Sequence, residues 1–201
     1  MGKVKERMQE EFQMKKIGML TSGGDCQALN AAMRGVVKGL SENVDELEVY
    51  GFLNGYKGLI YGDYRLLTSA DFSGILTKGG TILGSSRQPF KQMRVPDENG
   101  LDKVKAMKST YFKLNLDCLV ILGGNGTQKT ANLLREEGLN VIHLPKTIDN
   151  DLPLPAGSPT FGYQSAKDMG SIIGRTVATD AKTSGNWFVV AAMVVTSPLK
   201  N

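Results

Sequence analysis

The sequence predicts an α/β fold, doubly wound, with a mainly parallel sheet and helices on both faces. Two observations lead to this prediction: apolar runs of strand length alternate with amphipathic runs of helix length, and glycine-rich turns follow the apolar runs. The strand candidates are continuously apolar, which is typical of parallel strands covered by helices on both faces. Ligands of such sheets bind beyond the carboxyl ends of the strands, where the glycine-rich turns are expected.

The expected elements follow one another mostly as strand, turn and helix. Apolar residues of the helix candidates recur at the three- and four-residue spacing of one helix face. Gly138 is expected just beyond a helix end, where glycine adopts the left-handed conformation. In chain order, the sequence predicts strands over 16–20, 47–53, 117–122, 140–145 and 187–195, and helices over 28–40, 101–114, 128–138 and 165–177.

Length and composition indicate one globular domain. The chain has 201 residues, of which 41% are apolar and 22% are charged, and domains commonly contain roughly 100 to 200 residues. Residues 1–13 are expected to form a polar N-terminal tail. Residues 14–201 are expected to form the folded α/β domain.

Composition also disfavours several classes of partner. The longest apolar stretch, residues 187–195, is far shorter than the roughly 20 residues of a membrane-spanning helix, and the charged N-terminus does not read as a secretory signal. We therefore expect a cytoplasmic protein without a membrane partner, with Cys26 and Cys118 as thiols. The net charge of +4 comes from scattered residues, so nucleic acid is not an expected partner.

Two glycine-rich turns lie where strands are expected to end. Residues 21–25 read Thr-Ser-Gly-Gly-Asp, and residues 123–127 read Gly-Gly-Asn-Gly-Thr. Glycines let backbone N–H groups approach a phosphate at a helix N-terminus, and Thr127 is a candidate N-cap of the second helix. One such turn alone is equally typical of an ordinary strand–helix connection. Two of them on neighbouring strands favour a polyphosphate site.

Charged residues accompany these turns. Arg87 lies in a segment rich in glycine and serine, where its guanidinium could bridge phosphoryl oxygens, although a lone arginine is more often a surface residue. Asp149 and Asp151 follow a strand candidate, and side chains two apart on extended backbone point the same way. Such a pair suits a general base and its partner, and the alternative is an Asx turn.

The chain has one histidine, His143, which lies inside an apolar strand candidate. We therefore expect it to be packed in the core. A histidine-based catalytic triad or zinc site is excluded as the basis of function.

Taken together, the motifs resemble the 6-phosphofructokinase family. Segments 21–25, 79–87, 123–127 and 145–151 occur in the order, and with roughly the spacing, of that family, and the resemblance extends from residue 16 to about residue 193. It implies phosphoryl transfer from ATP to the 1-hydroxyl of fructose 6-phosphate, giving fructose 1,6-bisphosphate in glycolysis. It also implies a homo-oligomer in the full-length form.

The resemblance further implies roles for the residues that match the family's motifs. Asp149 is expected to act as general base on the 1-hydroxyl, with Asp151 supporting it. Lys146 and Arg87 are expected to hold the phosphoryl group during transfer. The matches around the phosphoryl donor are Gly24, Tyr56, Arg87, Gln88, Gly124, Asn125, Gly126 and Thr127, and those around the sugar phosphate are Thr147, Ile148 and Asp149.

Two departures from the family pattern change what is expected. The family usually has an aspartate at the position of Asn125, where it helps to hold Mg²⁺, and a neutral amide is a weaker ligand for this hard cation. Magnesium is still expected as the partner of the phosphates. Val194 and Val195 stand where the family continues with Gly-Arg and a second domain. The sugar-phosphate domain is therefore expected to be truncated, and the chain alone is not expected to complete catalysis.

Donor choice is decided by two positions in this resemblance. Pyrophosphate-using members have an aspartate at the position of Gly126 and a lysine at that of Lys146. This chain combines the glycine with the lysine, which favours ATP within a subgroup related to the pyrophosphate enzymes. A pyrophosphate-dependent enzyme and a catalytically incomplete nucleotide-binding fragment remain the alternatives. NAD kinases and lipid kinases lack the segment that matches residues 145–151.

Overall fold

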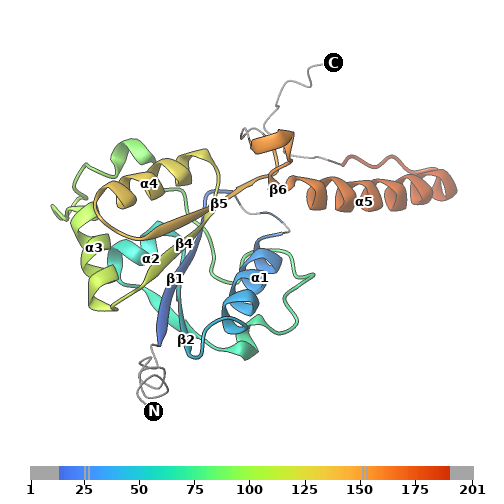
Figure 1. Cartoon of the computed structure of the whole chain (residues 1–201). Coiled ribbons are helices and arrows are strands. Elements are labelled where there is room, and N and C mark those ends of the chain that lie inside the picture. Colours follow the sequence, from blue (N-terminus) through green and yellow to red (C-terminus); the bar gives the residue numbers. More distant parts are fainter. Residues whose placement is uncertain (1–13, 25, 27, 151, 153, 191–201) are drawn as a thin grey trace, which may run out of the picture.

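A computed structural model shows a doubly wound α/β architecture, which confirms the predicted fold class (Figure 1). It describes residues 14–24, 26, 28–150, 152 and 154–190. In this part of the chain, six strands form one sheet in the order β3-β2-β1-β4-β5-β6. Neighbouring strands are parallel except for β2 and β3, which pair antiparallel.

Most of the predicted elements agree in place with those of the structure. The first four predicted strands and all four predicted helices have counterparts. The strands are β1 (Lys15–Ser22), β2 (Leu47–Phe52), β3 (Tyr64–Leu67), β4 (Cys118–Gly123), β5 (Val141–Thr147) and β6 (Phe161–Gly162), and the α-helices are α1 (Leu29–Ser41), α2 (Tyr56–Tyr61), α3 (Lys103–Lys113), α4 (Asn125–Glu136) and α5 (Tyr163–Ser184).

The core consists of two apolar layers, one on each face of the sheet. In β4, Leu119 and Ile121 pack with residues of α2, α3 and α4, whereas Val120 and Leu122 pack with residues of α1. This division follows from the alternation of side chains along a strand. Figure 1 shows α1 on one side of the sheet and α2, α3 and α4 on the other.

The strand order reverses its direction of growth between β1 and β4. From β1, the chain passes through α1 to β2, which lies on one side of β1 in the sheet. From β4, it passes through α4 to β5, which lies on the opposite side of β4. Parallel pairing of β1 with β4 places Ser22 beside Gly123. The carboxyl ends of these two strands therefore form the switch point at which doubly wound sheets bind ligands.

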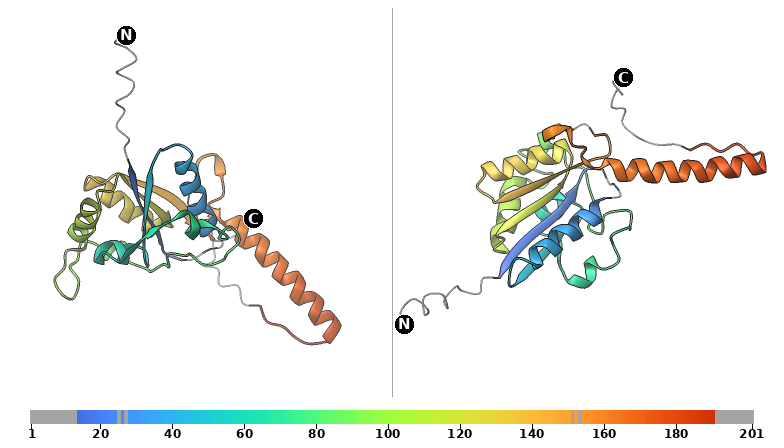
Figure 2. Two further views of the ribbon diagram at one scale, coloured as in Figure 1. Left: turned by 90° about the horizontal axis from the view of Figure 1, so that it is seen from below. Right: turned by 45° about the vertical axis from the view of Figure 1, so that its right-hand side comes forward.

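Helix α5 differs from the expectation that every helix covers the sheet. It has no buried residue and projects away from the sheet in each view (Figures 1 and 2). Met169, Ile172 and Ile173 are 45%, 49% and 49% exposed. Helical periodicity identified this apolar face correctly, but it contains no information on which surface covers the face.

The strand predicted over 187–195 is wrong for the residues that the structure describes. Residues 187–190 adopt no regular secondary structure, Trp187 is 98% exposed, and residues 191–195 lie outside the described part of the chain. A strand requires a neighbour that satisfies its backbone N–H and C=O groups. Helix α5 carries this segment away from both edges of the sheet (Figure 1).

Three short elements, β3, α2 and β6, were not predicted. Each spans six residues or fewer, which is too short for a periodic pattern to be recognised. Helix α2 packs tightly, because a Cβ atom on Gly58 would lie 2.3 Å from the carbonyl oxygen of Leu53. This contact explains why a glycine occupies a helical position.

Two further expectations concern the membrane and the thiols. Among the described residues, no helix is both long enough and apolar enough to span a bilayer. Cys26 and Cys118 are both buried and do not form a disulfide.

Replacing Leu119 by alanine should destabilise the fold strongly. Its side chain is fully buried between β4 and the helices of one face, so the cavity left behind should lower the free energy of unfolding by about 2 to 5 kcal/mol. The control is Leu76→Ala, at a leucine that is 60% exposed, for which a change within about 0.5 kcal/mol is expected. Urea unfolding measures both, and equal effects would contradict the packing described above.

Candidate functional site

A cavity of about 550 Å³ lies at the switch point, beyond the carboxyl ends of β1, β4 and β5. Segments from all four sequence motifs contribute to its wall. The lining residues are Ser22, Gly23, Gly24, Arg87, Gln88, Pro89, Phe90, Gly124, Asn125, Gly126, Thr127, Lys146, Thr147, Ile148 and Asp149.

The turn after β1 forms one wall of the cavity. Gly23 has a φ of +86°, a left-handed conformation that favours glycine. A Cβ atom on Gly24 would meet no described atom within 4 Å, so the backbone at this position faces open space. The turn therefore leaves open space at Gly24 on the side of the cavity.

Hydrogen bonds join this turn to the loop that carries Arg87. The hydroxyl of Thr21 donates to the carbonyl of Gly84 at 2.8 Å, and the hydroxyl of Ser85 donates to the carbonyl of Gly23. In return, the amide of Gly23 donates to the carbonyl of Ser86 at 3.4 Å. The turn and the loop therefore form one hydrogen-bonded unit. This unit positions Arg87 and Gln88, which follow Ser85 and Ser86 and line the cavity.

Asn30 holds the start of the same loop. This side chain is 1% exposed. Its amide nitrogen donates to the carbonyl of Lys78 at 2.9 Å, and its amide oxygen accepts from the backbone N–H of Ile82 at 2.9 Å. Sequence reasoning missed this role, because Asn30 lies within a helix whose pattern signals only packing.

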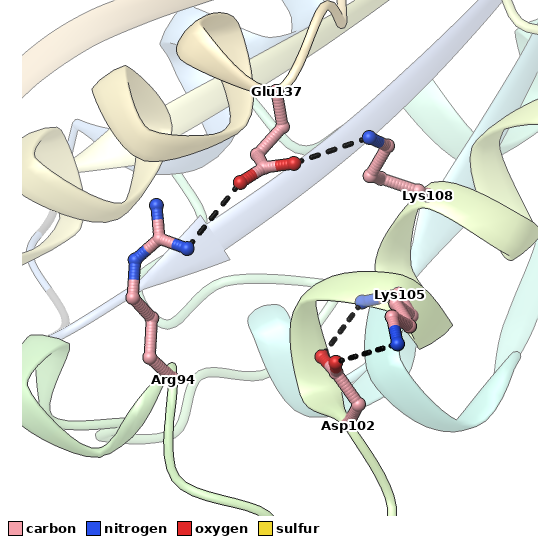
Figure 3. Close-up of polar contacts among 5 residues, drawn as sticks. All are labelled: Arg94, Asp102, Lys105, Lys108 and Glu137. Atoms are coloured by element: carbon pink, nitrogen blue, oxygen red, sulfur yellow. Dashed lines mark hydrogen bonds and ion pairs between the residues drawn. The ribbon is translucent and has the colours of Figure 1, made fainter.

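The far end of the loop is held by the charged contacts that Figure 3 shows and by one buried apolar residue. Glu137, which follows α4, accepts hydrogen bonds from Arg94 at 3.4 Å and from Lys108 of α3 at 3.1 Å. The Lys108 ammonium, together with Arg94, lowers the pKa of Glu137. Exposed ion pairs stabilise little on their own, and the neighbouring Met93, 1% exposed, adds an apolar anchor.

The N-terminus of α4 forms the opposite wall. Gly124 is its N-cap and no side chain caps the helix, so the N–H groups of the first turn are available to an anion. Thr127 is therefore not the N-cap that the sequence suggested. It lies in the first turn, where its side chain occupies space that a Cβ atom on Gly123 would need, at 2.5 Å. The paired glycines let the helix begin at Asn125, three residues before the predicted start at residue 128.

Lys146 and Asp149 approach the cavity from the end of β5. Lys146 is 4% exposed, and its ammonium donates to the carbonyl of Gly24. The amide of Asp149 donates to the hydroxyl of Thr147 at 3.1 Å. In the described part of the chain, the Oδ1 atom of Asp149 is buried and has no hydrogen-bond partner. A buried carboxylate oxygen of this kind is costly unless a ligand satisfies it.

The segment that contains Asp149 is a turn and not extended backbone. Asn150 has a φ of +51°, and its Oδ1 atom accepts from the amide of Thr160 at 3.0 Å. The Thr160 hydroxyl donates in turn to the carbonyl of Thr147 at 2.8 Å. The positive φ shows that the backbone is not extended at Asn150, so the expectation that Asp149 and Asp151 point the same way along extended backbone loses its basis. Asp151 lies outside the described residues.

Tyr56 does not line the cavity, contrary to the expectation from the resemblance. Its side chain is 1% exposed and belongs to the core. The hydroxyl donates to the carbonyl of Thr127 at 2.8 Å. Tyr56 therefore supports the first turn of α4 from the core. Its ring packs in the core and its hydroxyl bonds to Thr127, so the ring does not reach the opening of the cavity.

The structure adds four lining residues that sequence reasoning missed. Ser22, Gly23, Pro89 and Phe90 lie within two residues of predicted site residues. Phe90 is 40% exposed and begins the short 3-10 helix η3 (Phe90–Gln92). An aromatic residue in a loop usually signals the core, so its place on the cavity wall had no recognisable signature.

Fold and cavity define a class: doubly wound α/β proteins in which glycine-rich turns and an uncapped helix N-terminus face an open cavity at the switch point. A family model described as Phosphofructokinase matches residues 16–194. The chain belongs to the phosphofructokinase family.

Relatives of known name share this match. The chain is 56% identical to an ATP-dependent 6-phosphofructokinase of Spirochaeta thermophila, over 76% of this chain and 42% of the relative. It is 38% identical to a pyrophosphate–fructose 6-phosphate 1-phosphotransferase of Amycolatopsis methanolica, over 89% of this chain and 49% of the relative. The chain thus spans about half the length of the curated relatives that it matches.

Solved structures agree. Phosphofructokinase from Saccharomyces cerevisiae superposes with a TM-score of 0.68 at 27% identity, over 84% of this chain and 24% of that chain. Pichia pastoris phosphofructokinase in the T-state gives a TM-score of 0.64 at 30% identity, over 75% of this chain and 17% of that chain.

Tyr56→Phe should lower stability in a pH-dependent way. Loss of the bond to Thr127 should cost about 0.5 to 1.5 kcal/mol near pH 8. Burial raises the pKa of Tyr56, so the unfolded chain releases this proton first. The stabilisation from Tyr56 is therefore complete below about pH 10 and declines above it.

Urea unfolding at about pH 8 and about pH 11 checks this dependence. The difference between the wild type and Tyr56→Phe should shrink at the higher pH. Tyr64→Phe, in the edge strand β3, serves as the control. A difference between the wild type and Tyr56→Phe that stays constant with pH would show that Tyr56 is not buried as described.

Proposed function

We propose that this chain is the phosphoryl-donor-binding part of a 6-phosphofructokinase, which transfers a phosphoryl group from ATP to the 1-hydroxyl of fructose 6-phosphate. The observation that carries the proposal is that the predicted donor residues, apart from Tyr56, line the same cavity as Asp149. The family membership of the chain and the names of its relatives support the same reaction.

Binding of the phosphoryl donor is assigned to two glycine-containing walls of the cavity, which we call the two glycine walls. They are the turn at Gly23 and Gly24 and the start of α4 at Gly124 and Gly126. The backbone at Gly24 and Gly126 is open, because a Cβ atom at either position would meet no described atom within 4 Å. Phosphates can therefore approach the N–H groups at the start of α4 closely. Arg87 and Gln88 line the same cavity, and the guanidinium supplies a planar donor for phosphoryl oxygens.

Acceptor activation is assigned to Asp149. Its unpartnered Oδ1 atom would accept the proton of the 1-hydroxyl as that oxygen bonds to the γ-phosphorus and the bond to ADP breaks. Thr147 and Ile148 lie beside it on the cavity wall and would contact the sugar phosphate. Asp151 is proposed to support Asp149. Lys146, held at the Gly24 carbonyl, would stabilise charge on the transferred group.

Magnesium is proposed to arrive with the phosphates. No group of three or more His, Cys, Asp or Glu side chains that could hold a metal occurs among the described residues. The cavity offers the carboxylate of Asp149 and the amide oxygen of Asn125, which fits a cation that keeps phosphate and water ligands. Such a cation neutralises charge on the donor phosphates.

ATP is the preferred donor in this proposal, because the space beside Gly126 can accommodate the part of ATP beyond the transferred group. Lys146 and the Amycolatopsis methanolica relative support pyrophosphate as the second candidate. We further propose a cytoplasmic location and assembly of the full-length protein as a homo-oligomer. The homo-oligomer follows from the family resemblance.

Asp149→Asn should abolish phosphoryl transfer and leave donor binding intact. The amide cannot accept the hydroxyl proton, so turnover with fructose 6-phosphate, Mg²⁺ and ATP should fall by about 10² to 10⁴-fold. The affinity for ATP, measured by calorimetry, should stay within about threefold of the wild type, which is less than 1 kcal/mol. Turnover retained in the variant would overturn the role of Asp149. ATP binding without turnover in the wild type would support the donor-binding fragment.

Gly126→Asp should change donor preference. A carboxylate here enters the open space beside the donor and repels its phosphates, so the affinity for ATP should fall by at least about tenfold. The affinity for pyrophosphate should increase relative to the affinity for ATP. The matched control is Gly39→Asp in α1, where a Cβ atom also meets no described atom within 4 Å. Calorimetric titration with both donors decides, and unchanged ATP affinity would remove Gly126 from the donor site.

A further inference from the structure

His143 lies outside the cavity but beside both segments that build it. It occupies the middle of β5 and pairs in register with Ile121 of β4. The side chain is half-buried, so the expectation of a packed core histidine is met only in part. The described residues thus leave this imidazole at the border between core and surface.

One edge of the imidazole ring contacts Gly123, the first residue of the glycine-rich turn over residues 123–127. The Nε2 atom of His143 lies 3.0 Å from the carbonyl oxygen of Gly123, and a carbonyl can only accept, so Nε2 carries the proton and donates. Gly123 ends β4 and directly precedes Gly124, the N-cap of α4. The bond therefore acts on the peptide group that leads into the first turn of this helix.

The ring also lines a small cavity between α4 and the Asp149 turn. This space of about 280 Å³ is bounded by Gln128, His143, Pro145, Leu152 and Leu154. Gln128 belongs to α4, and the two leucines follow the turn that carries Asp149. His143 is therefore placed where the proposed donor and acceptor segments meet.

Simple space filling does not account for this arrangement. An aliphatic side chain would fill a half-buried position equally well, but it would not bond Gly123. Burial lowers the pKa of His143, which favours the neutral imidazole, and the bond to Gly123 selects the tautomer protonated at Nε2. A neutral donor fixes a backbone carbonyl without placing a further charge near the phosphates.

We infer that His143 is a positioning residue that fixes the Gly123 carbonyl and thereby the backbone of residues 124–127 for polyphosphate binding. The effect on affinity rests on the proposed function. The effect on the backbone does not, because it concerns the chain without ligand. His143 touches no reacting group in this account.

The test compares three variants of the 201-residue chain. His143→Leu removes the donor, His143→Gln keeps an amide N–H near the place of Nε2, and Ile142→Gln puts the same amide one residue away. Ile142 is 52% exposed and its side chain points to the other face of the strand. Should the leucine variant not fold, His143→Asn, whose amide is too short to reach Gly123, takes its place.

The first readout is the set of backbone amide resonances of residues 124–127 without ligand. They should move in His143→Leu, return towards the wild type in His143→Gln, and stay in place in Ile142→Gln. Resonances that do not move in His143→Leu, or that move equally in His143→Gln, overturn the inference.

The second readout is the dissociation constant for ATP with Mg²⁺. It should rise roughly tenfold in His143→Leu and by less than about threefold in His143→Gln. Equal dissociation constants in the wild type, His143→Leu and His143→Gln would overturn the link between His143 and the affinity for ATP. A wild type that binds neither ATP nor pyrophosphate refutes the proposed function instead, and the amide resonances still decide the role of His143.

Discussion

The parallel pairing of β1 with β4 is the constraint on which the candidate site depends. It sets Ser22 beside Gly123, so two turns that are about 100 residues apart in sequence begin at the same level of the sheet. Each strand is held in this register by the apolar layers on its two faces, and slipping by one residue would turn every one of these side chains to the wrong face. The core therefore fixes the distance between the two glycine walls.

Above this level, the site is built from backbone groups that side chains hold in place. Asn30, Thr21 and Ser85 bond to carbonyl or amide groups of the loop and the first turn. Tyr56 and His143 do the same for the start of α4 and the end of β4. The peptide groups that face the cavity are thus prearranged, which is how a protein favours a charged ligand at small reorganisation cost.

Much of this could be predicted, for reasons that differ between residues. Gly24 and Asn125 were found because a glycine turn after an apolar strand has a local signature, and topology then brings such turns together. Tyr56 was misplaced, since a motif match identifies a neighbourhood but not the side of the backbone on which a ring packs. The backbone at Asn150 was expected to be extended but has a positive φ, and its side chain bonds to Thr160, ten residues away, a contact that no local pattern signals. The face of α5 was recognised, while its surroundings were not encoded in its periodicity.

The projection of α5 also determines how the chain moves in solution. A helix of 22 residues is about 33 Å long at 1.5 Å per residue, which is comparable to the diameter of a small domain. Because it extends beyond the sheet (Figure 2), the described part of the chain is elongated in one direction. Its frictional ratio exceeds that of a sphere of equal mass, and its rotational diffusion is anisotropic, slowest for tumbling that reorients the helix axis.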